Sequence, residues 1–188
     1  LFGVGWGITG FCPGNAVNKL NFQKLLLTTF HLNYLPAVHL VDRYMDTVRH
    51  LGIINDGQGL DYFVPERDIV HLQDFTDRDL SAGFVAVTVG AQHYTKVLPI
   101  EQLASILEGL EMPVVLLGGR QEATRGEVLS EKNSNIINLC GKLNLNQSAD
   151  VIRQSSMVLA HDTGLMHMAA AFKKPVVSVC GSTIPGFG

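Results

Sequence analysis

The sequence predicts an α/β domain with a doubly wound parallel sheet, and three observations lead to this prediction. Five short apolar runs follow one another between residues 84 and 180, and stretches of helical pattern separate them. The runs are continuous rather than alternating, which is typical of strands that are buried on both faces. Strands and helices alternate along the chain, as they do in parallel α/β sheets.

The predicted strands and helices have clear boundaries. The strands are "FVAVTV" (84–89), "PVVLLG" (113–118), "NIINL" (135–139), "MVLA" (157–160) and "VVSVC" (176–180). The helices between them cover residues 99–110, 121–132, 146–155 and 164–174. Pro99 suits a first helical turn, and Pro113 and Pro175 stand after helices, where a helix cannot continue. Each predicted helix therefore connects two successive strands.

The first 81 residues are less regular. Residues 36–52 carry apolar side chains at helical spacing and end at Gly52, which suits a helix C-cap. Residues 21–32 also predict a helix, whereas residues 54–68 are turn-rich and then extended, as in a linker. The chain starts at Leu1 and stops soon after a strand. We expect a remnant of an N-terminal domain with its linker over 1–81, and a C-terminal domain truncated at its end over 82–188.

Composition excludes several classes of protein. A net charge of −3 and a pI near 6.1 disfavour a nucleic-acid-binding protein, which normally has a basic face. The three cysteines lack C-x-x-C spacing and fit a reducing compartment, so we expect a cytoplasmic protein. No apolar run approaches the roughly 18 residues of a membrane-spanning helix. With 46% hydrophobic residues, the chain can form a globular core.

Ligands of open parallel sheets bind beyond the carboxyl ends of the strands. Five predicted loops meet there, and each contains glycine, which lets the backbone approach a ligand closely. They are residues 90–96, 119–122, 140–146, 161–164 and 181–188. Lys96, Arg120 and Lys142 lie in these loops. Glycines and cations at one sheet edge predict a pyrophosphate site.

The segment "HDTG" (161–164) is the centre of this predicted site. Asp162 can cap the following helix, while the Thr163 and Gly164 amides can bind an anion. Since phosphate would repel a carboxylate, we expect Asp162 to face sugar hydroxyls or a cationic neighbour. His167 stands about one turn into the helix, and we expect its side chain to reach the same predicted ligand site.

Each candidate also has an ordinary structural interpretation. Asp162 could be only an N-cap, His167 a core histidine, Glu122 a first-turn glutamate and Lys96 a solvated lysine. A metal site is not expected, because the spacing of His161 and His167 does not place both on one helix face. The glycines near the N-terminus follow no predicted strand, which makes an NAD-binding fingerprint weak.

Three stretches resemble the C-terminal donor-binding domain of glycosyltransferase family 9, the ADP-heptose lipopolysaccharide heptosyltransferases. They are "VAVTVGAQHYTKVLP", "PVVLLGGRQE" and "NIINLCGKLNLNQSADVIRQSSMVLAHDTGLMHMAAAFKKPVVSVCGSTIP". The resemblance runs over residues 84–188 and includes the D-T-G-x-x-H and G-G-x-x-E elements in order. It implies a GT-B fold of two Rossmann-like domains. It also implies inverting transfer of heptose, or a related sugar, from an ADP-sugar to a lipopolysaccharide core acceptor.

The resemblance assigns roles by position. Lys96 matches the family's donor-phosphate lysine and Glu122 its glutamate near the nucleoside. The donor-binding signature matches Asp162, Thr163, Gly164 and His167. Leu98 departs from the aromatic residue that the family usually has there. The resemblance implies no metal and no cofactor, and its donor substrate is ADP-heptose or a related ADP-sugar. It also implies a peripheral contact with the cytoplasmic face of the inner membrane.

The resemblance leaves the catalytic residue unassigned. The family's general base stands in an N-terminal glycine-rich loop that this sequence does not show, so we expect it upstream and expect this chain alone to be inactive. The alternative that we retain is a non-catalytic nucleotide-sugar-binding protein.

Overall fold

The computed structural model describes residues 40–91 and 94–180 and divides the chain into two compact units, Leu1–Ile53 and Ile54–Gly188. In the first unit, helix α3 (Leu40–Val48) continues into a short 3₁₀ helix, Arg49–Leu51. It ends at Gly52, whose φ of 75° is left-handed, as in a glycine C-cap. The helix predicted over 36–52 is confirmed for its described part, while the one predicted over 21–32 lies outside the described residues.

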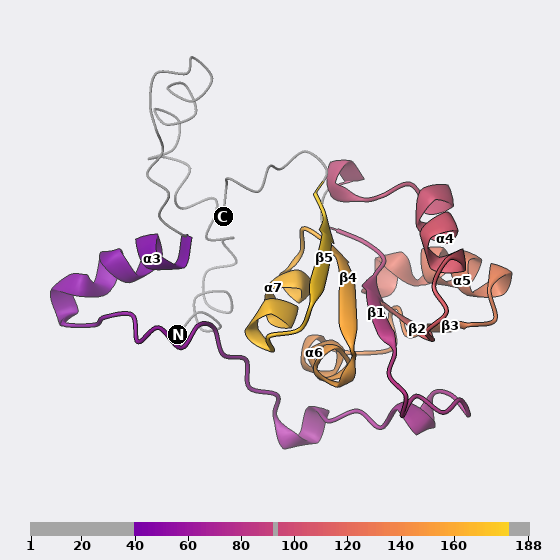
Figure 1. The fold of residues 1–188 in the computed structure, drawn as a ribbon, viewed down its shortest axis with the longest axis horizontal. Coiled ribbons are helices and arrows are strands. Elements are labelled where there is room, and N and C mark those ends of the chain that lie inside the picture. The colour runs from indigo at the N-terminus through magenta and orange to yellow at the C-terminus, as the bar shows by residue number, and fades with distance from the viewer. Residues whose placement is uncertain (1–39, 92–93, 181–188) are drawn as a thin grey trace, which may run out of the picture. The chain divides into compact units, whose positions relative to one another are not determined.

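The second unit holds a five-stranded parallel sheet (Figure 1). Its strands are β1 (Val85–Thr88), β2 (Val114–Leu117), β3 (Ile136–Asn138), β4 (Met157–His161) and β5 (Val176–Val179). All five predicted strands are confirmed, and their ends differ from the predicted ones by at most one residue. The predicted α/β fold with a doubly wound parallel sheet is therefore confirmed.

The strand order is β3-β2-β1-β4-β5. The chain starts in the middle with β1, moves outward through β2 to β3, and then returns to place β4 on the other side of β1. Val85 accordingly pairs with Val114 of β2 and with Met157 of β4. The order reverses between β1 and β4, and open sheets of this kind bind ligands at such a point, beyond the carboxyl ends of the strands. We call the place where the loops after β1 and β4 meet the crevice.

Helices cover both faces of the sheet (Figure 1). On one face lie α4 (Ile100–Glu108) and α5 (Ala123–Lys132), and on the other α6 (Leu145–Gln154) and α7 (Gly164–Ala171). These confirm the four helices predicted between the strands, with a short 3₁₀ helix, Arg120–Glu122, preceding α5. None of the helices within the described ranges is both long and apolar enough to cross a membrane.

Successive strand side chains enter two separate cores. Val85 and Val87 pack with Leu103 and Leu107 of α4, while Ala86 between them joins the core beneath α6 and α7. Because both faces are covered, the strands need apolar residues at every position, which explains their continuous rather than alternating runs. Burial of each such leucine contributes about 1.5–3 kcal/mol.

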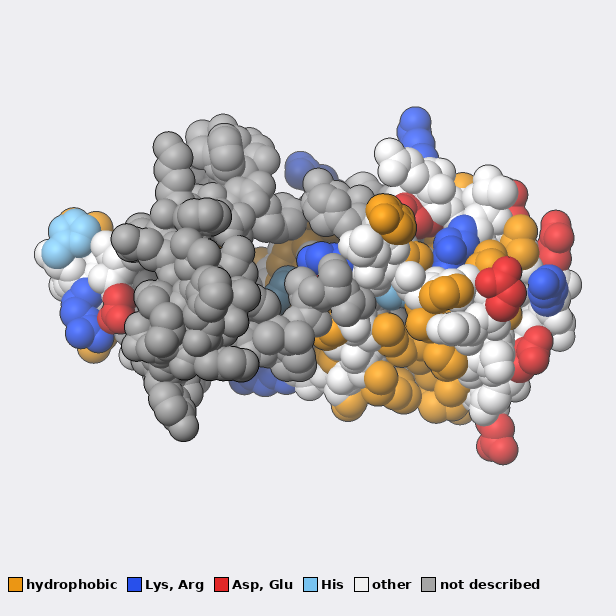
Figure 2. All heavy atoms as spheres, turned by 90° about the horizontal axis from the view of Figure 1, so that it is seen from above, with side chains coloured by type: hydrophobic (Ala, Val, Ile, Leu, Met, Phe, Trp, Pro, Cys, Tyr) orange, Lys and Arg blue, Asp and Glu red, His pale blue; other side chains and the backbone are white. Residues whose placement is uncertain are grey.

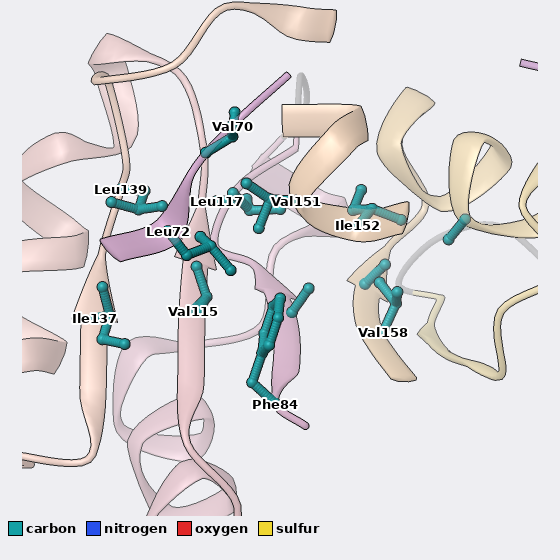
Figure 3. Packing of buried hydrophobic residues seen from close by; sticks show 13 residues of the cluster. Val70, Leu72, Phe84, Val115, Leu117, Ile137, Leu139, Val151, Ile152 and Val158 are labelled. Carbon is teal, nitrogen blue, oxygen red and sulfur yellow. The ribbon is translucent and has the colours of Figure 1, made fainter. Parts of the chain in front are cut away.

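Residues 61–72, which we call the strap, pack along the α6 face of the sheet. Val70 and Leu72 are each 5% exposed and join the core formed by Val115, Ile137 and other residues on this face (Figure 3). The compact unit that holds the sheet begins at Ile54. It therefore includes residues 54–81, which the sequence assigned to the remnant domain and its linker.

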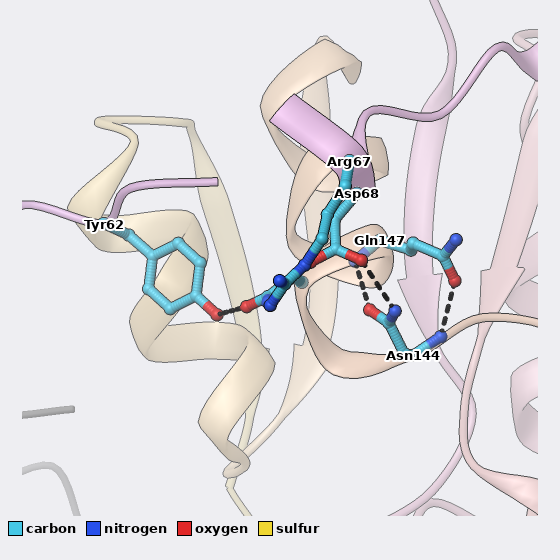
Figure 4. Close-up of polar contacts among 6 residues, drawn as sticks. Tyr62, Arg67, Asp68, Asn144 and Gln147 are labelled. Atoms are coloured by element: carbon cyan, nitrogen blue, oxygen red, sulfur yellow. Dashed lines mark hydrogen bonds and ion pairs between the residues drawn. The ribbon is translucent and has the colours of Figure 1, made fainter. Parts of the chain in front are cut away.

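Polar contacts fasten the strap to the start of α6 (Figure 4). Asp68 accepts hydrogen bonds from the side-chain amides of Asn144, at 2.9 Å, and Asn146, at 2.8 Å. The Tyr62 hydroxyl donates to Asn146 Oδ1 at 2.7 Å. The bond from Asn144, followed by that from Asn146, holds the pKa of Asp68 below its usual value. The strap is thus an ordered part of the sheet domain.

Candidate functional site

The loops after β1 and β4 meet at the point where the strand order reverses. Lys96 ends a short 3₁₀ helix after β1, and Asp162 follows the last residue of β4. Lys96 Nζ donates to Asp162 Oδ2 at 2.6 Å, and the two side chains are 22% and 23% exposed. The expectation that Asp162 faces a cationic neighbour is confirmed, and Lys96 is not a fully solvated lysine.

Asp162 does not cap α7, so the capping prediction is wrong. The N-cap residue is Thr163, with φ −140° and ψ 167°, and α7 starts at Gly164. Asp162 stands one residue too early, and its carboxylate turns toward Lys96 instead. The Thr163 side chain makes no capping hydrogen bond with the described residues. Helices leave their first amides without internal partners, so this end of α7 keeps donors that an anion can use.

His167 is exposed on α7, which rules out the core-histidine interpretation. It stands one turn from the N-terminal end of the helix, on the element that starts at the crevice. Its reach toward a ligand there stays a prediction.

Glu122 joins the ends of two neighbouring strands. Its Oε2 accepts a hydrogen bond from the Gly119 amide at 2.8 Å. A Cβ atom at Gly90 would lie 2.4 Å from Glu122 Cγ, and one at Gly118 would lie 2.8 Å from Glu122 Cβ. Both positions must be glycine for the glutamate to lie across the loops after β1 and β2. The bond to the Gly119 amide is that of a glutamate in the first turn of the 3₁₀ helix Arg120–Glu122, so the first-turn interpretation is confirmed. The role of Glu122 near a nucleoside stays a prediction.

Two of the three predicted loop cations do not join the Lys96–Asp162 pair. Arg120 and Lys142 are exposed, and Lys142 lines an open hollow of about 430 Å³ beside edge strand β3, together with Phe75 and Arg78. Where described residues of the sheet domain are visible in Figure 2, acidic and basic side chains are interspersed. Among the described residues, no three His, Cys, Asp or Glu side chains are grouped as metal ligands.

The structure adds His161, for which the sequence analysis found no role. It is the last residue of β4, only 2% exposed, and its Nε2 accepts a hydrogen bond from the Leu98 amide at 3.0 Å. Burial lowers the pKa of His161, the positive charge of Arg125 adds to this, and the Thr88 backbone opposes it. The imidazole is therefore neutral at neutral pH. A histidine ending a buried apolar strand was the available signal, because buried polar groups need partners.

Arg125 of α5 contacts the same loop. Its Nη2 donates to the Leu98 carbonyl oxygen. Burial lowers the pKa of Arg125, and the charge of Glu101 opposes this shift. Nothing in the sequence pattern of α5 distinguishes Arg125 from a solvated helix residue, so its contact with Leu98 could not be predicted.

Three buried side-chain atoms in the described part of the chain have no hydrogen-bond partner: Arg125 Nε, His161 Nδ1 and Thr163 Oγ1. Two of these residues lie at the end of β4 and the start of α7, and the third contacts the Lys96 loop. Most buried polar atoms in native proteins are paired, and unpaired ones call for an explanation. Their concentration around the crevice marks it as the candidate site.

Comparison with known proteins identifies the family. The model of glycosyltransferase family 9 (heptosyltransferase) matches residues 23–188. Lipooligosaccharide heptosyltransferase 2 of Haemophilus influenzae is 34% identical over 100 residues, which are 50% of this chain and 27% of that protein. Lipopolysaccharide heptosyltransferase 2 of Escherichia coli K12 is 34% identical over 79 residues, 39% of this chain and 23% of that protein.

Solved structures show the same fold. The E. coli heptosyltransferase WaaC with ADP has a TM-score of 0.61 and 26% identity, over 81% of this chain and 47% of that one. A family 9 glycosyl transferase of Veillonella parvula has a TM-score of 0.62 and 22% identity, over 74% of this chain and 42% of that one. The match thus spans less than half of these solved chains and about a quarter of the curated relatives. The predicted GT-B type of fold is confirmed for the sheet domain, and this chain belongs to glycosyltransferase family 9, the heptosyltransferases.

Proposed function

We propose that this chain carries the donor-binding half of a heptosyltransferase. The reaction is inverting transfer of heptose, or a related sugar, from an ADP-sugar to a lipopolysaccharide core acceptor. The observation that carries the proposal is the Lys96–Asp162 pair at the β1/β4 crevice, beside the N-terminal end of α7. The family membership and the names of the curated relatives support the sugar and acceptor class.

The donor diphosphate binds between Lys96 and the start of α7. An ammonium group has three N–H donors, and Lys96 uses one on Asp162, so others can reach phosphate oxygens. The Thr163 and Gly164 amides and the buried Thr163 hydroxyl add neutral donors. Each charge-assisted hydrogen bond contributes about 1.5–3 kcal/mol. Glu122 faces the nucleoside, and Asp162 and His167 face the sugar.

These groups stabilise the departing nucleoside diphosphate. As the bond between sugar and phosphate breaks, negative charge grows on the ADP oxygens, and preorganised cations and amides favour that charge. An inverting transfer also needs a base that takes the proton of the acceptor hydroxyl. We assign that base to none of the described residues. In this proposal the donor site works without a metal or an additional cofactor.

Two solved structures of the same relative, E. coli WaaC, support ADP as the nucleotide: one is with ADP and the other with ADP-2-deoxy-2-fluoro heptose. The spacing of the cysteines supports a cytoplasmic location. A peripheral contact with the inner membrane, where a lipopolysaccharide core acceptor would be met, is part of the same proposal.

Isothermal titration of the chain with ADP, ADP-heptose, UDP and NAD tests the donor assignment. We expect ADP and ADP-heptose to bind more tightly than UDP or NAD. NAD as the tightest ligand would contradict the proposal. Because the base is assigned to none of the described residues, we expect no heptose transfer by this chain alone. A full-length version of the enzyme, given ADP-heptose and a lipopolysaccharide core acceptor, then separates a transferase, which releases ADP, from a protein that only binds nucleotide-sugars.

A further inference from the structure

Leu98 is held through both of its backbone polar groups. Its amide donates to His161 Nε2 at 3.0 Å, and its carbonyl oxygen accepts from Arg125 Nη2. The first contact comes from the end of β4 and the second from α5, so two separate elements fix one residue of an irregular loop. Leu98 stands two residues after Lys96, and the Val97 amide closes the short 3₁₀ helix on the Tyr94 carbonyl at 3.1 Å.

We propose that His161 and Arg125 are positioning residues that clamp the Leu98 backbone and thereby hold Lys96 in place for the donor diphosphate. The clamp itself follows from the contacts alone, whereas its effect on the donor rests on the proposed function. Neither residue needs to touch the donor. Each acts through the loop that carries Lys96.

The chemistry of both side chains suits this task. His161 can accept from the Leu98 amide only when Nε2 carries no proton, which places the proton of the neutral ring on Nδ1. The burial of His161 and the nearby charge of Arg125 both favour that neutral form. Arg125 stays charged and donates through a rigid planar group, so its contact with the Leu98 carbonyl is directional.

The clamp contacts the backbone of Leu98 and not its side chain, which packs against the core beneath α4 and α5. The clamp therefore does not depend on which side chain stands at position 98.

A pair of substitutions at His161 tests the first arm. In His161→Gln the side-chain carbonyl can take the place of Nε2 as acceptor, whereas His161→Met has similar length and cannot accept from an amide. We expect His161→Met to speed hydrogen exchange of the Leu98 amide and to weaken ADP binding about 5–10-fold, the worth of one hydrogen bond. Adenosine affinity should stay within about twofold, and His161→Gln should restore both properties.

A second pair tests the other arm. Arg125→Gln removes the contact with the Leu98 carbonyl, and Lys132→Gln removes the same charge from an exposed position on the same helix. We expect Arg125→Gln to weaken ADP binding about 5–10-fold and Lys132→Gln to leave it within about twofold. Equal losses in the two variants would show that Arg125 acts only through its charge and would overturn its positioning role.

The outcomes separate the clamp from the proposed function. Unchanged exchange of the Leu98 amide in His161→Met would overturn the clamp, whatever happens to ADP. Faster exchange with equal losses for ADP and adenosine would overturn its action through Lys96. If the native chain binds no ADP, the proposed function fails, and the Lys96 ammonium resonance then tests the clamp. That resonance should report loss of the Asp162 pair in His161→Met and its retention in His161→Gln, and the opposite result overturns the clamp.

Discussion

Polar side chains hold an irregular segment in two regions of the molecule, the strap on α6 and the Lys96 loop at the crevice. The two regions differ in how completely those side chains are hydrogen-bonded. We call the strap together with the α6 side chains that hold it the strap region. There, Asp68 of the strap and Asp150 of α6 use both carboxylate oxygens, and Tyr62 donates through its hydroxyl. In the crevice, Arg125, His161 and Thr163 each leave a buried polar atom without a partner among the described residues.

This difference teaches how to tell a structural cluster from a functional one. A cluster that only holds the chain together gains most when every group is paired, because each unpaired buried group costs about 1–3 kcal/mol. Incomplete pairing persists where another demand competes with stability. Substitutions in the strap region should therefore reduce stability and spare ligand binding, while substitutions in the crevice should do the reverse.

The largest effect is expected from Asp150→Ala. Asp150 is fully buried, accepts from the Val70 amide at 2.9 Å and pairs with Arg153 at 2.6 Å. Its loss leaves the Val70 amide and the guanidinium group without these contacts. We expect the free energy of unfolding to fall by about 2–3 kcal/mol, below the 3–5 kcal/mol of a fully buried pair because Arg153 is half exposed.

Urea denaturation measures this change, with Asp77→Ala as the exposed control, expected within about 0.5 kcal/mol of the native chain. ADP affinity of the folded Asp150→Ala protein should stay unchanged. A large loss of ADP affinity without a loss of stability would break the distinction between the two regions.

Lys96→Met should have the opposite profile. Removal of the ammonium group is expected to weaken ADP binding by about 1.5–3 kcal/mol, or roughly 10- to 150-fold, with little effect on adenosine. Titration calorimetry of both ligands measures this, and Lys142→Met, exposed beside β3, is the control. Similar losses for ADP and adenosine would show that Lys96 only stabilises the fold.

Asp162→Asn should separate ADP-sugar from ADP. The substituted amide can still accept a hydrogen bond from Lys96 through its side-chain oxygen, so the change in stability should stay near the worth of one hydrogen bond, about 0.5–1.5 kcal/mol. Binding of ADP-heptose should weaken clearly more than binding of ADP, because Lys96 remains available to the diphosphate. His167→Ala should behave similarly, and the double variant should be non-additive if both side chains reach the same sugar. Unchanged ADP-heptose affinity in Asp162→Asn would reduce Asp162 to a partner of Lys96.

The smallest effect is expected from pH, and it should appear in a different range for each region. The pKa of His161 is lowered from 6.5, so the unfolded state binds more protons than the folded one below that value. Stability should decline as pH falls from 6.5 toward the folded pKa. Arg125 on α5 and the Lys96–Asp162 pair on the neighbouring loops are the charged groups near this histidine.

For Asp68 the same reasoning gives a lower range. Its pKa is lowered from 3.8, so the stability that its bonds contribute is complete above that value and is lost as pH falls through the folded pKa. Thermal unfolding measured across pH reports both declines in stability, the one from His161 and the one from Asp68. His161→Gln should remove the decline that starts near pH 6.5, and Asp68→Asn the one below pH 3.8. A single common transition would contradict the separation of the two regions.

The sequence by itself determined the strands, the helices between them and the edge of the sheet where the loops meet. The runs 84–89 and 113–118 became β1 and β2 because continuous apolar character records burial on both faces. Parallel strands place their carboxyl ends at one edge, which is why Lys96 and Asp162 could be predicted to share a site.

Only the tertiary structure decided which partner each polar group takes. Asp162 pairs with Lys96, 66 residues away, instead of capping the helix beside it. Leu98 is held by His161, 63 residues away, and by Arg125, 27 residues away. Burial leaves a periodic pattern in the sequence, since it repeats along a strand or helix. A hydrogen bond depends on distance and direction between elements far apart in the chain, and those are fixed only once the sheet has formed.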